Sequence, residues 1–167
     1  MKRIYFTDFD GTITKFDTTD AMIETFTQKD SWQGIMRKWE LGELNTKESA
    51  RLFFRHLQVT PEEAANFLRS IPIDETFHEF VDYVEGRQEN LYILSDGFDF
   101  NIKTILEKTK LTHLKFYTNR FLIYTDHYDL ETPYASSCNK CGTCKKTLVD
   151  RLKTDAEQIV YIGDGIS

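Results

Sequence analysis

Two carboxylates stand two residues apart near the start of the chain, directly after a short apolar run. The run, Ile4 to Phe6, is rich in aromatic and β-branched residues and predicts a buried strand that ends at Asp8 and Asp10. Side chains alternate along a strand, so both carboxylates would point the same way, and Gly11 lets the backbone turn directly afterwards. Two like charges this close repel, so we expect a cation between them. Mg²⁺, a hard ion held by oxygen ligands, fits best.

Three other polar positions follow apolar runs or open a helix. Ser95 and Asp164 each come just after a four-residue apolar run, and Lys145 begins a predicted helix. In open α/β sheets the ligand crevice lies outside the carboxyl ends of the strands, and Ser95 would lie at such an end. Taken singly each has a plain alternative, because Asp-Gly and Ser-Asp-Gly are common turns and a lone Lys is ordinarily a surface charge.

The opening D-F-D-G-T, Asp8 to Thr12, resembles the first motif of the haloacid dehalogenase (HAD) superfamily of phosphotransferases. The resemblance implies that Asp8 is the nucleophile and Asp10 the general acid and base. It also implies that the Thr12 hydroxyl helps to hold the geometry of the site.

Two other stretches resemble phosphate-binding motifs of the same superfamily. The resemblance implies that the Ser95 hydroxyl bonds a phosphoryl oxygen, and Asp96 and Gly97 could add N–H donors near the start of the next helix, where anions are favoured. It also implies that a Lys at a helix start neutralises the nucleophile and the phosphate. Lys145 is the better candidate for this role, and Lys146 is its neighbouring competitor.

The last residues, Gly163 to Ser167, resemble the fourth motif, whose Asp ligates the metal. The resemblance implies a Mg²⁺ site made by Asp8, Asp164 and the main-chain carbonyl of Asp10. A second acidic residue usually follows the Ser of this motif, and here the sequence stops. We therefore expect that the C-terminal part of the core is missing, that the chain is a fragment or a truncated form, and that it binds Mg²⁺ weakly.

Three cysteines spaced by two residues, Cys138, Cys141 and Cys144, allow a second metal hypothesis. Three thiolates and one further ligand would form a tetrahedral structural Zn²⁺ site, and His113 or His127 could supply the fourth ligand. The alternative is a loop of reduced thiols, which a reducing compartment permits.

The order of apolar patterns predicts strands separated by helices, hence a parallel sheet with right-handed crossovers. The fold class expected is α/β, a Rossmann-like HAD core at residues 1–14 and 74–167 with a helical cap at 15–73. Thr60, Pro61 and Glu63 form the clearest helix start, a capping box with Pro at the first helical position. Residues 116–117 and 121–124 are predicted as two short strands, and 125–144 as irregular.

Composition restricts the class of function. Hydrophobic residues make up 40% and charged residues 29% of the 167 residues, which is typical of a globular protein. The net charge of −6, without a basic stripe, argues against binding to nucleic acid. No apolar run is long enough for a membrane span and the start lacks a signal-peptide pattern, so a cytoplasmic location is expected. The sequence gives no prediction of oligomeric state.

The helical insertion, the S-D-G-F-D-F stretch and the Cys-rich loop resemble the phosphoserine-phosphatase-like branch of the superfamily, and within it members that act in methionine salvage. The resemblance implies a Mg²⁺-dependent hydrolase that acts on a small phosphorylated metabolite through an aspartyl-phosphate. Phosphoserine, phosphocholine and pyridoxal phosphate are alternative substrates. A truncated relative that binds without catalysis is the alternative from another class.

Overall fold

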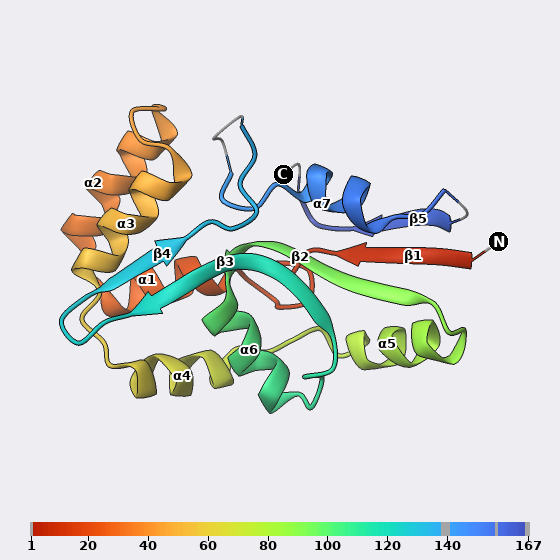
Figure 1. Ribbon diagram of the computed structural model, residues 1–167. Helices are drawn as coiled ribbons and strands as arrows, with labels where there is room; N and C mark the ends of the chain where they lie inside the picture. The colour runs from red at the N-terminus through yellow and green to blue at the C-terminus, as the bar shows by residue number, and fades with distance from the viewer. Residues whose placement is uncertain (1, 138–140, 156, 166–167) are drawn as a thin grey trace.

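The computed structural model describes residues 2–137, 141–155 and 157–165, which form a sheet with helices on both of its faces (Figure 1). The strands are β1 (Lys2–Thr7), β2 (Asn90–Phe98), β3 (Lys115–Ile123), β4 (Tyr128–Glu131) and β5 (Glu157–Ile162). The helices are α1 (Thr18–Phe26), α2 (Lys29–Glu40), α3 (Thr46–His56), α4 (Pro61–Ser70), α5 (Phe77–Gly86), α6 (Asp99–Lys108) and α7 (Lys145–Leu152). Within these ranges, no helix is both long enough and apolar enough to cross a bilayer.

The five strands lie in the order β4-β3-β2-β1-β5. β1 is parallel to both β2 and β5, and β2 is parallel to β3, while β4 runs antiparallel to β3 at one edge. The helices α4, α5 and α6 lie on one side of the sheet and α7 on the other (Figure 1). This arrangement confirms the predicted α/β class and brings the carboxyl ends of β1, β2 and β5 to the same edge.

β2 and β3 lose their regular register where β2 reaches the carboxyl edge. Leu94 pairs with Tyr117 and Phe98 with Asn119, so three residues of β2 stand opposite Thr118 alone. This bulge turns the strand locally, as bulges do. The hydroxyl of Thr118 donates to the main-chain oxygen of Gly97 at 2.8 Å and so satisfies one of the carbonyl groups that the bulge takes out of the ladder.

The β3–β4 hairpin differs from the prediction in two ways. The two short strands predicted at 116–117 and 121–124 are parts of one strand, β3, and residues 128–131 of the segment expected to be irregular form β4. β4 has only four residues, too few for a periodic signal, and it is stabilised by pairing with β3 and by burial of Leu130 against Phe54 and Phe98. Tertiary contacts therefore decide this strand.

Polar side chains cap the starts of α1, α3 and α4. The Asp17 side chain accepts hydrogen bonds from the N–H groups of Thr19 and Asp20 at the start of α1. The predicted capping box of Thr60 and Glu63 is present at α4. α3 begins with a second box, whose cap is Asn45. Each box satisfies N–H groups that a helix cannot pair internally.

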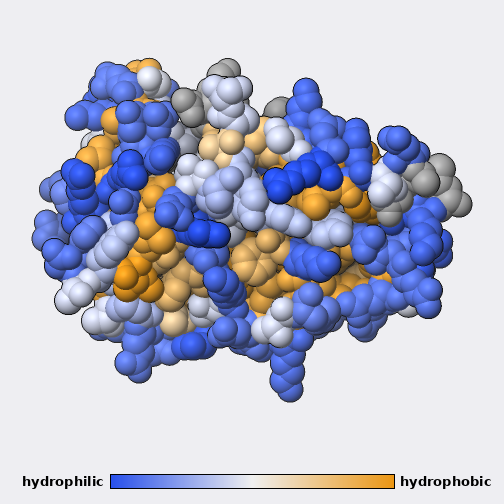
Figure 2. Space-filling view, viewed as in Figure 1, coloured by the Kyte–Doolittle hydropathy of each residue, from blue (hydrophilic) through white to orange (hydrophobic). Residues whose placement is uncertain are grey.

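Residues 15–72 contain the helices α1 to α4, and these helices do not share one apolar core. Met22 of α1 and Leu68 of α4 belong to the principal core, with residues of β2, α5 and α6. A separate cluster joins Ile35 of α2 and Phe53 of α3 to Ile23. In Figure 1, α2 and α3 project beyond the end of the sheet toward which the parallel strands point. The space-filling view from the same side, Figure 2, shows mostly hydrophilic side chains, with apolar side chains visible along the strands. The division at 15–73 stays a prediction.

The two ends of the insertion lie side by side. Thr14 and Ile73 form an antiparallel bridge, and the Asp74 N–H donates to the Ile13 oxygen at 2.7 Å. The Lys15 ammonium lies 3.0 Å from an Asp74 carboxylate oxygen. Hydrogen bonds from the Thr76 hydroxyl, from Lys15 and from the Thr76 N–H lower the pKa of Asp74 to about 2.

The Asp74 carboxylate should stabilise this junction only while it is charged. Its folded-state pKa lies below the ordinary value of 3.8, so its contribution is present above pH 3.8 and is lost as the pH falls toward about 2. We expect Asp74→Asn to have a lower melting temperature than the wild type at pH 7, with a difference that shrinks as the pH falls below about 4. Lys15→Gln should reproduce part of the loss. A difference that grew with acidification would contradict the assignment.

Candidate active site

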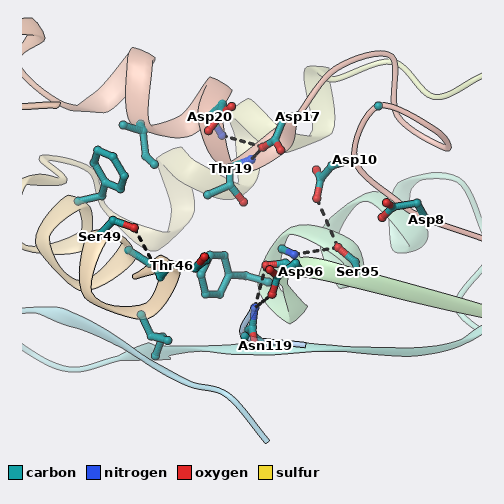
Figure 3. A pocket seen from close by; sticks show the side chains of 18 of the residues that line it. Asp8, Asp10, Asp17, Thr19, Asp20, Thr46, Ser49, Ser95, Asp96 and Asn119 are labelled. Carbon is teal, nitrogen blue, oxygen red and sulfur yellow. Dashed lines mark hydrogen bonds between the residues drawn. The ribbon is translucent and has the colours of Figure 1, made fainter. Parts of the chain in front are cut away.

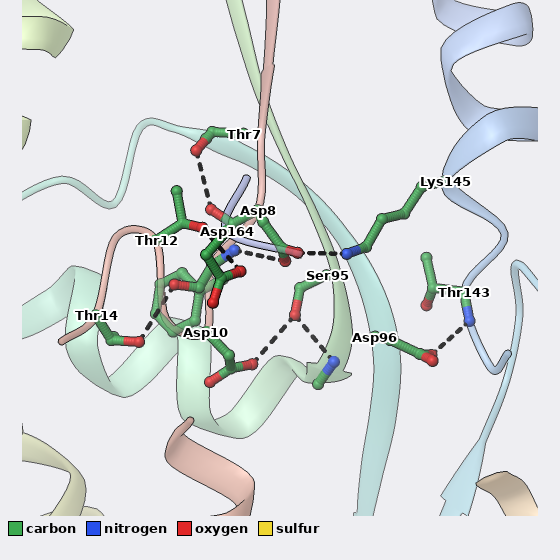
Figure 4. Close-up of polar contacts among 12 residues, drawn as sticks. Thr7, Asp8, Asp10, Thr12, Thr14, Ser95, Asp96, Thr143, Lys145 and Asp164 are labelled. Carbon is green, nitrogen blue, oxygen red and sulfur yellow. Dashed lines mark hydrogen bonds and ion pairs between the residues drawn. The ribbon is translucent and has the colours of Figure 1, made fainter. Parts of the chain in front are cut away.

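The first carboxylate, Asp8, stands immediately after β1 in a buried position. Its N–H donates to the main-chain oxygen of Ile162 at 2.8 Å, which fixes it against β5. One carboxylate oxygen accepts from the N–H of Phe9 at 2.8 Å, and the other accepts from the Lys145 ammonium at 2.5 Å (Figure 4). Asp8 is 9% and Lys145 is 7% exposed. The pair is thus a buried ion pair between the end of β1 and the start of α7.

The Lys145 ammonium is held in its charged form. Burial alone would lower its pKa, but the hydrogen bond and the negative charge of Asp8 outweigh burial, and the pKa is raised. The neighbouring Lys146 is exposed. The structure therefore selects Lys145 over Lys146 as the lysine that reaches Asp8.

The second carboxylate, Asp10, is held by Thr18 at the start of α1. One oxygen accepts from the Thr18 N–H at 2.8 Å and from the Thr18 hydroxyl at 2.6 Å, and the other lies 3.4 Å from the Ser95 hydroxyl. Burial first, and then the negative charge of Asp17, raise the pKa of Asp10 to about 7. A carboxyl group with this pKa can both give and take a proton near neutral pH.

Thr18 is a functional position that the sequence analysis missed. Its side chain is fully buried, and the Asn101 amide donates to its hydroxyl at 3.0 Å. The sequence shows only a Thr in a run of helix-start residues. The contact with Asp10 depends on how α1 is placed against the sheet, which the sequence pattern does not reveal.

The Ser95 to Gly97 stretch lies in the β2 bulge. Ser95 is fully buried, and its hydroxyl accepts from the Gly97 N–H at 2.9 Å, which leaves its O–H directed at Asp10. The Asp96 carboxylate accepts from the Asn119 amide at 3.1 Å and from the Thr143 N–H at 2.8 Å. Asp96 thus points toward the segment before α7, as Figure 4 shows.

Two glycines permit the close approach of the motifs. A Cβ atom on Gly97 would lie 2.6 Å from a carboxylate oxygen of Asp10 and 3.1 Å from the Ser95 hydroxyl. Gly11 has a φ of +71°, and a Cβ there would lie 2.3 Å from an oxygen of Asp164. A side chain at either position would therefore displace a carboxylate of the site.

Asp164 follows β5 and faces the first motif. The Thr12 hydroxyl lies 3.4 Å from one of its oxygens, and Figure 4 shows it beside Asp8. The charges of Asp8 and Asp164 contribute, after burial, to a raised pKa of Asp17. The site therefore concentrates negative charge that a cation would offset.

The donor set fits Mg²⁺. Among the described residues, no three His, Cys, Asp or Glu side chains are grouped as metal ligands. Mg²⁺ needs only one or two carboxylates, because waters and substrate phosphate complete its coordination. Asp8, Asp164 and the main-chain oxygen of Asp10 would supply such a set.

The structure gives no support to the zinc hypothesis. Cys138 lies outside the described residues, and Cys141 and Cys144 are partly buried. The two histidines considered as a fourth ligand face carboxylates instead: His113 lies 2.7 Å from Glu85, and His127 lies 2.7 Å from Asp126. Each contact engages one ring nitrogen of an exposed imidazole.

A cavity of about 640 Å³ opens onto these residues. Figure 3 shows Asp8, Asp10, Ser95 and Asp96 on one side, and Thr46 and Ser49 of α3 on another. Asp17 and Asp20 of the α1 region also line it, and burial and the charge of Asp17 raise the pKa of Asp20 to about 6. The helices α2 and α3 add an apolar wall composed of Met36, Trp39, Ala50, Phe53 and Phe54.

Replacing Gly97 should disturb the site more than the fold. In Gly97→Ala the new methyl group would displace the Asp10 carboxylate, which Thr18 holds on its other oxygen, so we expect kcat to fall by about tenfold or more. Gly86→Ala is the matched control, since a Cβ at this position of α5 meets nothing within 4 Å. Steady-state kinetics and thermal unfolding of both variants test this. Unchanged kcat in Gly97→Ala would show that Asp10 can shift without consequence.

Comparison with known proteins agrees with this geometry. A family model described as Putative Phosphatase matches residues 3–167. The chain is similar to the 2-hydroxy-3-keto-5-methylthiopentenyl-1-phosphate phosphatase of Bacillus pumilus (strain SAFR-032), with 32% identity over 171 residues, covering 99% of this chain and 73% of the relative. The phosphatase of the same name from Bacillus cytotoxicus is 30% identical, covering 97% and 75%.

Solved structures with the same fold include phosphoserine phosphatases. A structure of a phospho-aspartyl intermediate analogue of phosphoserine phosphatase has a TM-score of 0.72 and 23% identity, covering 98% of this chain and 78% of that chain. A substrate-bound phosphoserine phosphatase has a TM-score of 0.70 and 19% identity, covering 99% and 79%. The family match and the relatives from Bacillus show that the chain belongs to the putative phosphatase family and is a hydrolase, and it shares its fold with phosphoserine phosphatases.

Proposed function

We propose that the protein is a Mg²⁺-dependent phosphomonoester hydrolase in which Asp8 is the nucleophile and Asp10 the general acid and base. The observation that carries the proposal is the pairing of a buried, Lys145-bound carboxylate with a second carboxyl group whose pKa is about 7. A carboxyl group with a pKa near neutrality beside a lysine-bound carboxylate is typical of such a division of roles.

The chemistry would proceed in two steps. A carboxylate oxygen of Asp8 attacks phosphorus, the bond to the leaving oxygen breaks, and Asp10 gives its proton to the departing alcohol. A water molecule then attacks the aspartyl-phosphate, Asp10 takes its proton, and phosphate leaves with Asp8 restored. The protonated state of Asp10 that burial favours suits the first step.

The positive groups around the phosphate would be Lys145 and the metal. Lys145 offsets negative charge on Asp8 and on the transferred phosphoryl group, and the Ser95 hydroxyl bonds a phosphoryl oxygen. Mg²⁺ held by Asp8, Asp164 and the Asp10 carbonyl would polarise the phosphoryl group and reduce the repulsion between it and the carboxylates.

We extend the proposal to a substrate with an apolar tail. The relatives from Bacillus are named for a methylthiopentenyl phosphate. The wall that α2 and α3 give to the cavity, including Met36, Trp39 and Phe53, suits a thioether chain better than it suits the charged amino and carboxylate groups of phosphoserine. Residues 15–73 would then act as a cap over the crevice, with α2 and α3 as the part that contacts the tail.

The nucleophile can be tested by a nearly isosteric change. Asp8→Asn keeps the shape of the side chain but removes the attacking carboxylate, so we expect hydrolysis of an aryl phosphate with Mg²⁺ to fall by about a thousandfold or more. Asp82→Asn, which alters an exposed carboxylate on α5, should leave the rate unchanged. Wild-type turnover in Asp8→Asn would remove Asp8 from the mechanism.

The preference for an apolar tail can be tested at the cavity wall. Trp39 lines the cavity and is 43% exposed, so its indole is free to contact a ligand. We expect Trp39→Ala to lower kcat/KM for the methylthiopentenyl phosphate by about tenfold and to change kcat/KM for phosphoserine much less. Leu41→Ala, an exposed apolar change just after α2, is the control. Equal losses for both substrates would exclude Trp39 from tail recognition.

A further inference from the structure

The β2 bulge leaves main-chain groups that β3 satisfies with side chains. Where three residues of β2 face Thr118 alone, the ladder cannot pair every carbonyl. The Thr118 hydroxyl donates to the Gly97 oxygen, and the Asn119 amide donates to the Asp96 oxygen at 2.7 Å. The shape of the bulge that holds Ser95 therefore depends on two consecutive polar side chains.

The amide of Asn119 is engaged on both of its ends. Its nitrogen donates to the main-chain oxygen of Asp96 and to the Asp96 carboxylate, and its oxygen accepts from the Thr143 hydroxyl at 3.2 Å. Asn119 is 2% exposed, and Figure 3 shows its side chain directed at Asp96. A side-chain amide offers two N–H donors and one carbonyl, and these contacts use them. Asn119 thus acts on its protein neighbours although it borders the cavity.

The partner segment leads directly to Lys145. The Thr143 N–H donates to the Asp96 carboxylate at 2.8 Å, so Asn119 and Asp96 hold Thr143 from two sides. Gly142 packs flat against the Asn119 amide, since a Cβ there would lie 2.4 Å from the amide oxygen and 2.7 Å from the nitrogen. Two residues after Thr143, the chain enters α7 with Lys145 paired to Asp8.

We propose that Asn119 is a positioning residue for the phosphatase reaction, which locks the Ser95 bulge to the segment that presents Lys145. The proposal rests on the proposed function. Ser95 comes from β2 and Lys145 from α7, and the Asn119 amide contacts both supporting segments, beside the direct bond from the Thr143 N–H to Asp96. It would fix the spacing between the hydroxyl and the ammonium that receive the phosphate.

The first test compares two substrates that share only the phosphate. Asn119→Ala should lower kcat/KM by about tenfold to a hundredfold, because small displacements of catalytic groups are costly. The factor should be the same for an aryl phosphate and for phosphoserine, since the groups that move contact the phosphate and not the tail. Asn119→Asp, which loses the donors and adds a charge beside Asp96, should be at least as damaging. Unequal factors would assign Asn119 to substrate selection and overturn the proposal.

A smaller substitution at Thr143 tests the same contact in case Asn119→Ala fails to fold. Thr143→Val keeps the shape of the side chain and the N–H bond to Asp96 but removes the hydroxyl that donates to Asn119. We expect a loss in kcat/KM of about threefold to tenfold, again equal for both substrates. Thr104→Val is the control, because it removes a buried hydroxyl that bonds the Phe100 oxygen within α6. A loss of melting temperature in Thr143→Val with unchanged kcat/KM would show a purely structural role.

The sharpest test uses the contact between Gly142 and Asn119. Gly142→Ala should push the amide away and lower kcat/KM by about tenfold in the wild type. In the Asn119→Ala background the clashing atoms are gone, so adding Gly142→Ala should cost less than about twofold. Independent, multiplicative losses would mean that Gly142 acts without Asn119 and would overturn the proposal.

The affinity for inorganic phosphate tests the positioning role of Asn119 separately from the proposed phosphatase activity. Calorimetry with phosphate and Mg²⁺ should show weaker binding in Asn119→Ala by a factor similar to the loss in kcat/KM. If the wild type bound phosphate but hydrolysed no monoester, the proposed function would fail. The difference in phosphate affinity between the wild type and Asn119→Ala would still test the role of Asn119. If wild type and Asn119→Ala bound phosphate equally, the positioning role would be wrong even in an active enzyme.

Discussion

The structure depends on placing several carboxylates around one crevice without letting their repulsion open it. Asp8 and Asp10 follow β1 and Asp164 follows β5, and Asp17 adds a fourth acidic side chain at the start of α1. The buried Lys145 ammonium neutralises part of this charge directly at Asp8. Burial lowers the negative charge further, since it favours the protonated form of Asp10. The remaining negative charge is what makes the crevice suited to a divalent cation.

The parallel sheet makes this grouping of carboxylates possible, because it places the carboxyl ends of strands that are distant in sequence side by side. β1 lies between β2 and β5, so each of its neighbours delivers one motif to the same edge. The strands must also stop pairing at that edge, because otherwise the main chain of the polar residues would be held in regular hydrogen bonds between strands. The bulge in β2 does this for Ser95, and the side chains of Thr118 and Asn119 take over the carbonyl groups that the ladder releases.

The inserted helices divide into two parts with different supports. α1 and α4 bury residues such as Met22 and Leu68 in the core that also packs against the sheet, and through Thr18 the start of α1 holds Asp10. α2 and α3 pack around their own apolar cluster and supply the outer wall of the cavity. The wall that would contact a substrate tail is therefore packed separately from the edge that carries the carboxylates. Chemistry and selectivity can change independently in such an arrangement.

The sequence by itself determined the α/β class, the helix start at Thr60, and the positions of the four motifs along the chain. These are local properties: apolar runs, capping residues and turn glycines act within a few residues of chain. Only the tertiary structure decided between Lys145 and Lys146, because the choice depends on which side of α7 faces Asp8. Only it revealed Thr18, Asn119 and Thr143, whose partners are 8 to 83 residues away in sequence. β4 was missed and β3 was divided for the same reason, since pairing and the burial of Leu130 are long-range contacts that four residues of pattern cannot encode.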